Sequence, residues 1–202
     1  MPEARPLTTP LESAKTAMFI FATAPPPPVW PDQFHAVCLQ NRSGHLALTD
    51  LWYDFPGGRN ANIIHRQLGS TTYDIEWTNG TSFFFSDQGG GCRMLHFDVG
   101  ILRPDWLSGG QYVGRREKDG FACDVWTKAE FITYYADVKT GRPVFWQFLG
   151  SGAEFHILRF EEGAVLGAEG WQAPAACFES GGTAALQVEG HSLLAELRGR
   201  TI

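Results

Sequence analysis

A chain of 202 residues, with 44% hydrophobic and 19% charged residues, is long and apolar enough for one domain with a sizeable core, which argues against a largely disordered protein. Aromatic residues make up 13% of the chain, a share that favours broad apolar sheet surfaces. The formal net charge of -6 argues against nucleic acid as a partner, because a protein that tracks a nucleic-acid backbone carries a basic field.

The first 27 residues are predicted to form a leader or a flexible proline-rich segment ahead of the domain. Residues 17–22 are a short apolar run that follows Arg5 and Lys15 and resembles a clipped signal peptide. This run is too short to span a bilayer, and no other stretch reaches that length, so no membrane span is expected. The four prolines at 25–28 predict a stiff polyproline spacer.

From residue 33 onward, short runs rich in aromatic and β-branched residues alternate with turn signals, a pattern typical of an antiparallel meander. Within 73–77, rings and isoleucine alternate with carboxylates, so the two kinds should point to opposite faces of a strand. Asn79-Gly80 and Asp119-Gly120 tolerate positive φ and predict tight hairpins. The expected strands are 33–40, 45–54, 60–67, 72–77, 81–86, 93–98, 111–117, 121–127, 131–137, 143–148 and 154–160.

These elements predict an all-β fold: a single strongly curved antiparallel sheet, or half-barrel, of about ten strands. One or two short helices are expected near its open face, with one helical turn at 104–107 and a short helix at 191–198. The curved domain should occupy residues 28–178, and 179–202 should form a C-terminal tail. No internal repeat or second domain is visible.

Cysteines and glycosylation sequons together predict the secretory pathway. The disulfide candidates are Cys38, Cys92, Cys123 and Cys177. They form no C-x-x-C pair, so a zinc site is not expected, and four cysteines allow three pairings between which the sequence does not choose. Sequons at Asn41 and Asn79 fall on predicted turns and predict a glycoprotein that is secreted or lies in the endomembrane lumen. The alternative is four buried thiols in a cytosolic protein.

Ionisable residues placed between large rings are the candidates for chemistry. We select His65, Glu76 and His96 as candidate catalytic residues, because a histidine or a carboxylate in a cavity can act as a general base. The histidines form no H-x-H or H-x-x-x-H pair, so no metal is expected, and the chain shows no dinucleotide fingerprint, so no cofactor is expected. The acidic set of Asp50, Asp54, Asp74 and Glu76 could also supply a general acid/base pair, but we expect these carboxylates to lie on a solvated strand face.

The leading hypothesis is that the concave face binds a hydrophobic or aromatic, lipid-like small molecule. The candidate ligand-binding residues are Trp52, Tyr53, Arg66, Trp77, Trp126, Tyr134 and Trp146. One alternative is a cofactor-independent isomerase or cyclase of specialised metabolism that uses the same cavity. Another is an extracellular interaction module with a flat apolar patch. The sequence leaves open whether the chain is an enzyme and whether it is a monomer or a dimer.

Seven segments have specific motifs: WPDQFHAV (30–37), DLWYDFPGGRNANIIHRQLG (50–69), YDIEWTNGTSFFF (73–85), CRMLHFDVGILRPDWL (92–107), DGFACDVW (119–126), TGRPVFWQF (140–148) and WQAPAACF (171–178). These segments resemble a family of plant and green-algal proteins that are mostly predicted to be secreted and have no established activity. The resemblance covers residues 28 to 178.

Two further motifs are Trp52-Tyr53-Asp54 and the pair Arg115-Arg116 before Asp119-Gly120. They are similar to the W-x-D strand, and to the R-R pair before a D-G hairpin, of the cofactor-free enzyme of the violacein pathway. The architecture of that enzyme includes ependymin-related proteins and bacterial lipoprotein carriers, so this is a more distant resemblance. This resemblance implies a sheet wrapped into a half-barrel around a hydrophobic cavity, and no catalytic residue is carried across it.

Overall fold

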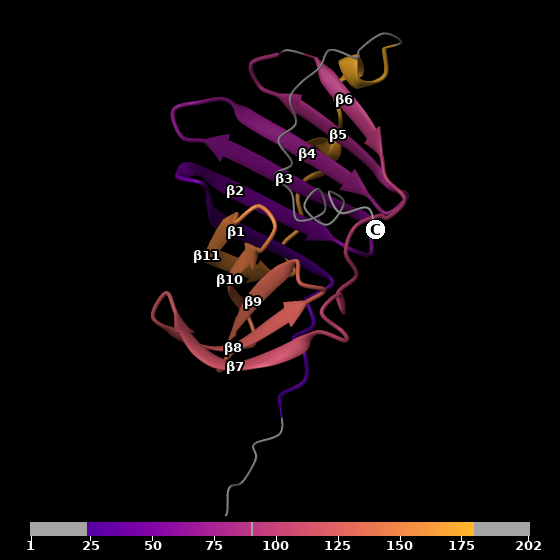
Figure 1. Ribbon diagram of the computed structural model, residues 1–202. Coiled ribbons are helices and arrows are strands. Elements are labelled where there is room, and N and C mark those ends of the chain that lie inside the picture. The colour runs from indigo at the N-terminus through magenta and orange to yellow at the C-terminus, as the bar shows by residue number, and fades with distance from the viewer. Residues whose placement is uncertain (1–23, 90, 180–202) are drawn as a thin grey trace, which may run out of the picture.

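A computed structural model describes residues 24–89 and 91–179. Eleven strands form one antiparallel sheet (Figure 1). They are β1 (Gln33–Arg42), β2 (His45–Asp54), β3 (Arg59–Arg66), β4 (Thr71–Trp77), β5 (Thr81–Ser86), β6 (Cys92–His96), β7 (Gln111–Lys118), β8 (Phe121–Lys128), β9 (Ile132–Asp137), β10 (Pro143–Phe148) and β11 (Glu154–Glu162). Most of the predicted leader, the tail beyond 179 and the predicted helix at 191–198 lie outside the described residues.

Two meanders make up the sheet. The strand order is β6-β5-β4-β3-β2-β1-β11-β10-β9-β8-β7, so β1–β6 form one meander, β7–β11 form the other, and the pairing of β1 with β11 joins them. The sheet curls without closing into a barrel, and β6 and β7 are the edge strands of its described part (Figure 1). Residues 97–110 connect these two edges. The prediction of a single curved antiparallel sheet is confirmed.

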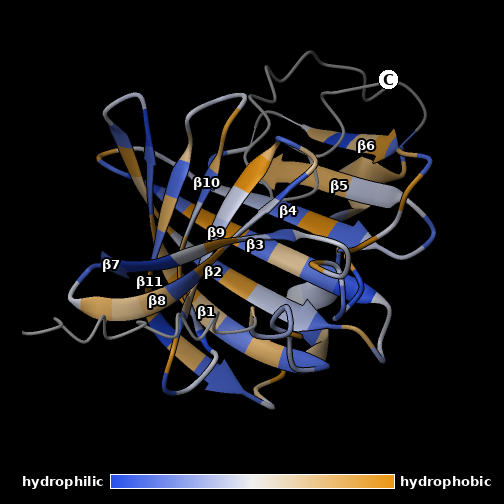
Figure 2. Cartoon of the chain, turned by 60° about the horizontal axis from the view of Figure 1, so that its bottom comes forward, coloured by the Kyte–Doolittle hydropathy of each residue, from blue (hydrophilic) through white to orange (hydrophobic). Residues whose placement is uncertain are grey.

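The strands alternate between hydrophobic and hydrophilic positions along their length (Figure 2). The concave face of the sheet is its inner face. There Phe34 of β1 and Tyr53 of β2 are cross-strand neighbours, and they are 1% and 2% exposed. Trp106 and Leu107 of the connecting segment pack against this inner face in the main core cluster. Burial of such large apolar side chains is the main stabilising contribution to the fold.

A second layer covers the outer face of the first meander. The segment after β11 carries two short 3₁₀ helices, η1 (Ala168–Trp171) and η2 (Ala175–Cys177), and Trp171 packs on Ala61 and Ile75. The predicted helical turn at 104–107 is instead a run of tight turns. The N–H groups of Trp106, Ser108 and Gly110 each donate to the carbonyl three residues earlier in the chain. None of the described helices is long and apolar enough to cross a membrane.

Two of the four disulfide candidates form a disulfide and the other two do not. Cys92 of β6 and Cys177 of η2 form a disulfide that ties the second layer to the edge of the sheet. Cys38 and Cys123 are buried free thiols on β1 and β8. Burial raises the pKa of the Cys38 thiol, with Asp50 adding to the effect, and burial raises the pKa of Cys123 to about 11.

The β4–β5 hairpin shows why its turn residues are fixed. The Asn79 side chain accepts a hydrogen bond from the Thr81 N–H at 2.9 Å, and Gly80 has a φ of +85°. A Cβ atom on Gly80 would lie 2.0 Å from the Phe97 carbonyl oxygen, so only glycine fits beneath the connecting segment.

Candidate functional site

Four of the predicted ligand-binding aromatics lie in the inner core of the sheet. Tyr53, Trp126, Tyr134 and Trp146 are each at most 3% exposed and belong to one cluster. Trp30 Nε1 donates to the Tyr134 hydroxyl at 2.9 Å, and the Tyr53 hydroxyl donates to the Leu102 carbonyl at 2.7 Å. Burial raises the pKa of both tyrosines. Packing and hydrogen bonds therefore fix these four side chains in the hydrophobic core.

Trp52 and Trp77 lie on the outer face, away from the concavity. Both are half-buried and pack against the cluster that contains Trp171. Trp52 also stacks on His35, with ring centroids 3.9 Å apart. The two tryptophans therefore bind the second layer to the sheet.

The three candidate catalytic residues do not come together. His65 is exposed on the outer face of β3, where Nε2 lies 3.2 Å from Asp50 Oδ2. Glu76 is fully buried on the inner face of β4, where Oε2 accepts from Asn60 Nδ2 at 3.1 Å. His96 is exposed on β6, three strands away from His65. No single site contains all three.

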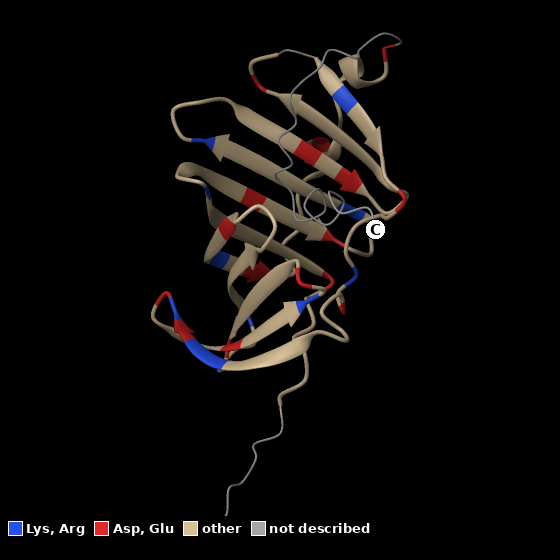
Figure 3. Cartoon of the chain, viewed as in Figure 1, with Lys and Arg blue, Asp and Glu red and all other residues tan. Residues whose placement is uncertain are grey.

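The inner face of β3–β5 carries a row of buried polar residues that includes the candidate Glu76. Asn60 pairs across strands with Glu76, and Asn62 pairs with Asp74. Ser82 is the next inner-face neighbour of Glu76. Acidic positions on β4 are visible in Figure 3. The expectation of a solvated strand face is therefore wrong for Asp74 and Glu76, which are 0% exposed.

Asp54, another residue of the acidic set, has a structural role at the β2–β3 turn. Its carboxylate accepts from Gln33, from Arg59 Nε at 2.8 Å and from the Gly57 N–H. Burial disfavours its ionised form, but the hydrogen bonds from Gln33, Arg59 and Gly57 outweigh that effect and hold its pKa below the usual range. Asp54 thus fixes a turn and has no free oxygen for chemistry.

A cavity of about 390 Å³ opens on the inner face at the ends of β1, β2 and β3. Cross-strand pairing brings Arg42 opposite His45 and Ala47 opposite Arg66, so these four residues share one face. The lining residues are Gln40, Arg42, Gly44, His45, Leu46, Ala47, Ile64, Arg66, Gln67 and Gly69. None of these described lining residues is acidic. We call this hollow the rim cavity.

The rim cavity combines positive charge with apolar walls. Arg66 and Arg42 are half-buried and His45 is exposed, whereas Ile64 is 2% exposed and forms an apolar wall. Gln40 is held in place by the Thr49 hydroxyl, which donates to its side-chain oxygen at 3.3 Å. An arginine pair of this kind suits a carboxylate or phosphate group, which guanidinium donors bind bidentately.

A wider hollow of about 680 Å³ lies at the β7–β8 hairpin, where basic residues gather on β7 (Figure 3). Its lining is mixed, with Arg115, Arg116 and Lys139 against Glu117 and Asp137. Arg115 is already paired with Asp124 at 3.1 Å, outside this set. Because opposite charges compensate each other here, this hollow is a weaker candidate for an anion than the rim cavity.

Sequence reasoning found Arg66 but missed its partners in the rim cavity. A signal was present: Gln40, Arg42, His45 and Ala47 flank a Ser43-Gly44 turn at positions that alternate onto one face. Metal binding has no comparable support. Within residues 24–89 and 91–179, no three histidine, cysteine or carboxylate side chains come together as metal ligands would.

Comparison with protein families gives one match that spans the sheet. Residues 29–177 match the model of a family described as a domain of unknown function, DUF8395. The chain belongs to this family. The DUF8395 domain includes all eleven strands, both 3₁₀ helices and every residue that lines the rim cavity. A search of the curated proteins returned no match.

One of two similar solved structures shares the fold at low sequence identity. An uncharacterized conserved protein from Thermus thermophilus matches with a TM-score of 0.54 and 12% identity, over 73% of this chain and 88% of that one. MucB matches with a TM-score of 0.33 and 16% identity, over 72% of this chain and 58% of its own, and a TM-score this low does not indicate a shared fold. These comparisons give no support for a plant or green-algal source or for a relation to ependymin.

Proposed function

We propose that this DUF8395 domain binds a small amphipathic anion, such as a short fatty acid, with its charged end in the rim cavity. The observation that carries the proposal is the composition of that cavity, in which Arg42, His45 and Arg66 converge and no described lining residue is acidic. The proposal keeps the lipid-like ligand suggested by the sequence and changes the residues that would contact it.

Charge supports an anionic ligand. The chain as a whole is acidic, with a formal charge of -6, so a local cluster of cationic side chains is not a consequence of composition. Arg66 has no hydrogen-bonded or ion-paired carboxylate among the described residues, whereas Arg59, Arg103, Arg115, Arg142 and Arg159 each have one. A ligand carboxylate would give Arg66 the charge-assisted partner that the other five already have.

Size supports a small ligand. Small-molecule sites commonly have volumes of roughly 300–1000 Å³, so a cavity of about 390 Å³ suits a short acyl chain or a single ring. Ile64, Ala47 and Leu46 would contact the apolar part. The aromatic core next to it would act as a rigid support and would not contact the ligand.

The disulfide is compatible with an oxidising compartment, since such bonds persist mainly in secreted and lumenal proteins. Asn79 is exposed in the β4–β5 turn and Asn41 is half-buried at the end of β1. Secretion and glycosylation of these two residues are therefore parts of the proposal. The isomerase or cyclase alternative has less support, because its candidate residues lie on different faces of the sheet.

Displacement of a dansyl-labelled fatty acid tests the proposal, with decanoate and uncharged decanol as competitors. We expect decanoate to compete and decanol to compete at least about tenfold more weakly, because charge-assisted bonds contribute roughly 1.5–3 kcal/mol. Arg66→Met should weaken decanoate by a similar factor. Arg103→Met is the matched control, because Arg103 lies in the connecting segment and pairs with Asp105.

Two results would contradict the proposal. One is an absence of decanoate binding to the unmodified chain. The other is equal loss of affinity in Arg66→Met and Arg103→Met. Binding of a protein partner without binding of any acyl anion would instead favour the interaction-module alternative.

A further inference from the structure

The junction between the two meanders depends on one strand pair. Within the described sheet, β1 and β11 are the only neighbours that belong to different meanders. Their pairing register shifts between Val37 and Cys38, so the ladder is irregular near its middle. We call this pair the seam. Side chains that bridge it on the outer face should influence how tightly the two halves of the sheet are held.

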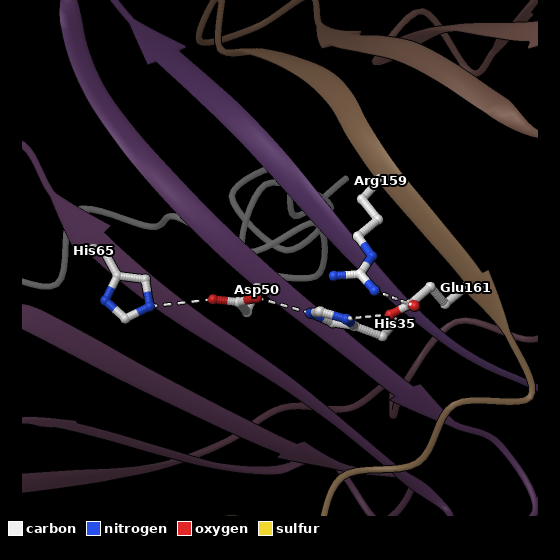
Figure 4. A network of polar contacts seen from close by, with 5 residues as sticks. All are labelled: His35, Asp50, His65, Arg159 and Glu161. Carbon is white, nitrogen blue, oxygen red and sulfur yellow. Dashed lines mark hydrogen bonds and ion pairs between the residues drawn. The ribbon is translucent and has the colours of Figure 1, made fainter.

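His35 bridges the seam and lies between two carboxylates (Figure 4). Its Nε2 is 2.8 Å from Asp50 Oδ1 of β2, and its Nδ1 is 3.3 Å from Glu161 Oε2 of β11. An ionised carboxylate only accepts hydrogen bonds, and a neutral imidazole has a single N–H to donate. Both contacts are hydrogen bonds only when each ring nitrogen carries a proton.

The position of the ring is fixed by packing. His35 is 7% exposed, and its ring stacks on Trp52 with an interplanar angle of 11°. Trp52 in turn packs against the cluster under Trp171. The ring is therefore held in the plane that directs its two nitrogens at the two carboxylates.

The surrounding charges complete a five-residue network on the outer face (Figure 4). Asp50 Oδ2 lies 3.2 Å from His65 Nε2 of β3, and Glu161 Oε1 accepts from Arg159 of β11. In the described residues, the titratable and charged side chains that face His35 or its carboxylates are thus Asp50, His65, Glu161 and Arg159. Glu161 accepts hydrogen bonds from His35 and Arg159. Both bonds lower the pKa of its carboxyl group, and the bond from His35 has the larger effect.

We propose that His35 is a proton-controlled clamp on the seam, which ties β11 to β1 and β2 while its ring carries both protons. When the ring loses one proton, a nitrogen lone pair faces a carboxylate oxygen and one of the two bonds is lost. This role concerns the stability of the seam and does not rest on ligand binding in the rim cavity.

The pH window follows from the signs of these effects. The doubly protonated imidazole makes both bonds at low pH, and one of them is lost when the ring gives up a proton as the pH rises. A carboxylate with a lowered pKa acts in the opposite sense, so the contribution of Glu161 is lost as the pH falls through its lowered value. The clamp is complete between these two limits.

Hydrogen exchange of the β1 and β11 amides tests the clamp. In the unmodified chain, we expect their protection, corrected for intrinsic exchange, to fall roughly tenfold between pH 6 and pH 8.5, since a charge-assisted bond is lost. His35→Phe keeps a ring on Trp52 and should be weakly protected at both pH values. His156→Phe is the matched control, because His156 pairs with Asp119 in the β7–β8 turn and not across the seam.

The same pH dependence in the unmodified chain and in His35→Phe would overturn the proposal. Ring ¹⁵N spectra of the unmodified chain give a second test that does not need a folded variant. We expect both His35 nitrogens to be protonated at pH 6. A neutral His35 tautomer at that pH would also overturn the proposal.

Discussion

Replacing Trp146 with alanine should destabilise the protein as a core substitution does. Trp146 is 2% exposed at the centre of β10. Its ring stacks on Tyr134 at 6.2 Å and on Phe155 at 5.6 Å, and these two residues are its cross-strand partners on β9 and β11. Truncation of such a ring removes its buried area and leaves a cavity, so we expect a loss of about 3–5 kcal/mol in the free energy of unfolding.

Urea unfolding followed by far-UV circular dichroism measures that loss. Phe121→Ala is the matched control, because the Phe121 ring is 50% exposed at the start of β8 and its removal should cost about 1 kcal/mol or less. If Trp146→Ala does not fold, Trp146→Phe should still lose a measurable part of the same free energy. A loss below about 1.5 kcal/mol for Trp146→Ala would refute the reasoning, since residues that line open pockets lose little packing when truncated.

Three further predictions concern the cysteines and one turn. Reducing the Cys92–Cys177 disulfide, which spans 85 residues, should lower the free energy of unfolding by about 2–5 kcal/mol in urea titrations with and without reductant; unchanged midpoints would contradict this. Cys38 and Cys123 should resist iodoacetamide at pH 8 in the native protein, because burial raises the pKa of both thiols, and mass spectrometry should find labelling only after unfolding. Asp54 has a lowered pKa, so its stabilising effect should be complete above pH 4 and disappear as the pH falls through the lower folded-state value; Asp54→Asn should abolish that part of the acid dependence of unfolding.

Local patterns in the sequence were sufficient to predict most of the sheet. The alternation in residues 73–77 predicts β4 and the separation of its rings from its carboxylates, and the structure has both. Asn79-Gly80 and Asp119-Gly120 predict hairpins whose residues adopt the required positive φ at Gly80, Asp119 and Gly120. These features depend on neighbours in the chain, so sequence alone contains them.

The faces of the sheet could not be assigned from sequence. Both faces of the first meander carry apolar residues, because the segment that contains Trp171 covers the outer one. Asp74 and Glu76 consequently lie on the inner face and are buried, although their alternation alone suits a solvated face equally well. Choosing between the two faces requires knowing which distant segment packs on which side.

The rim cavity was only partly predictable for the same reason. Arg66 could be chosen as a polar anchor from its place in a strand, but its proximity to Arg42 and His45 depends on the β1–β2 and β2–β3 registers. The disulfide likewise joins two cysteines that are 85 residues apart, and their pairing depends on how the second layer folds back. Contacts across such separations leave no local pattern in the chain.

The central claim is that an acyl anion binds in the rim cavity and not among the core aromatics. The most direct test is ¹H–¹⁵N NMR during a decanoate titration. We expect the Arg66 Nε–H signal to shift saturably, because the carboxylate binds beside it, while the indole N–H signals of Trp126 and Trp146 stay in place. Shifts of those indole signals with an unchanged Arg66 signal would contradict the account and return the ligand to the aromatic concavity.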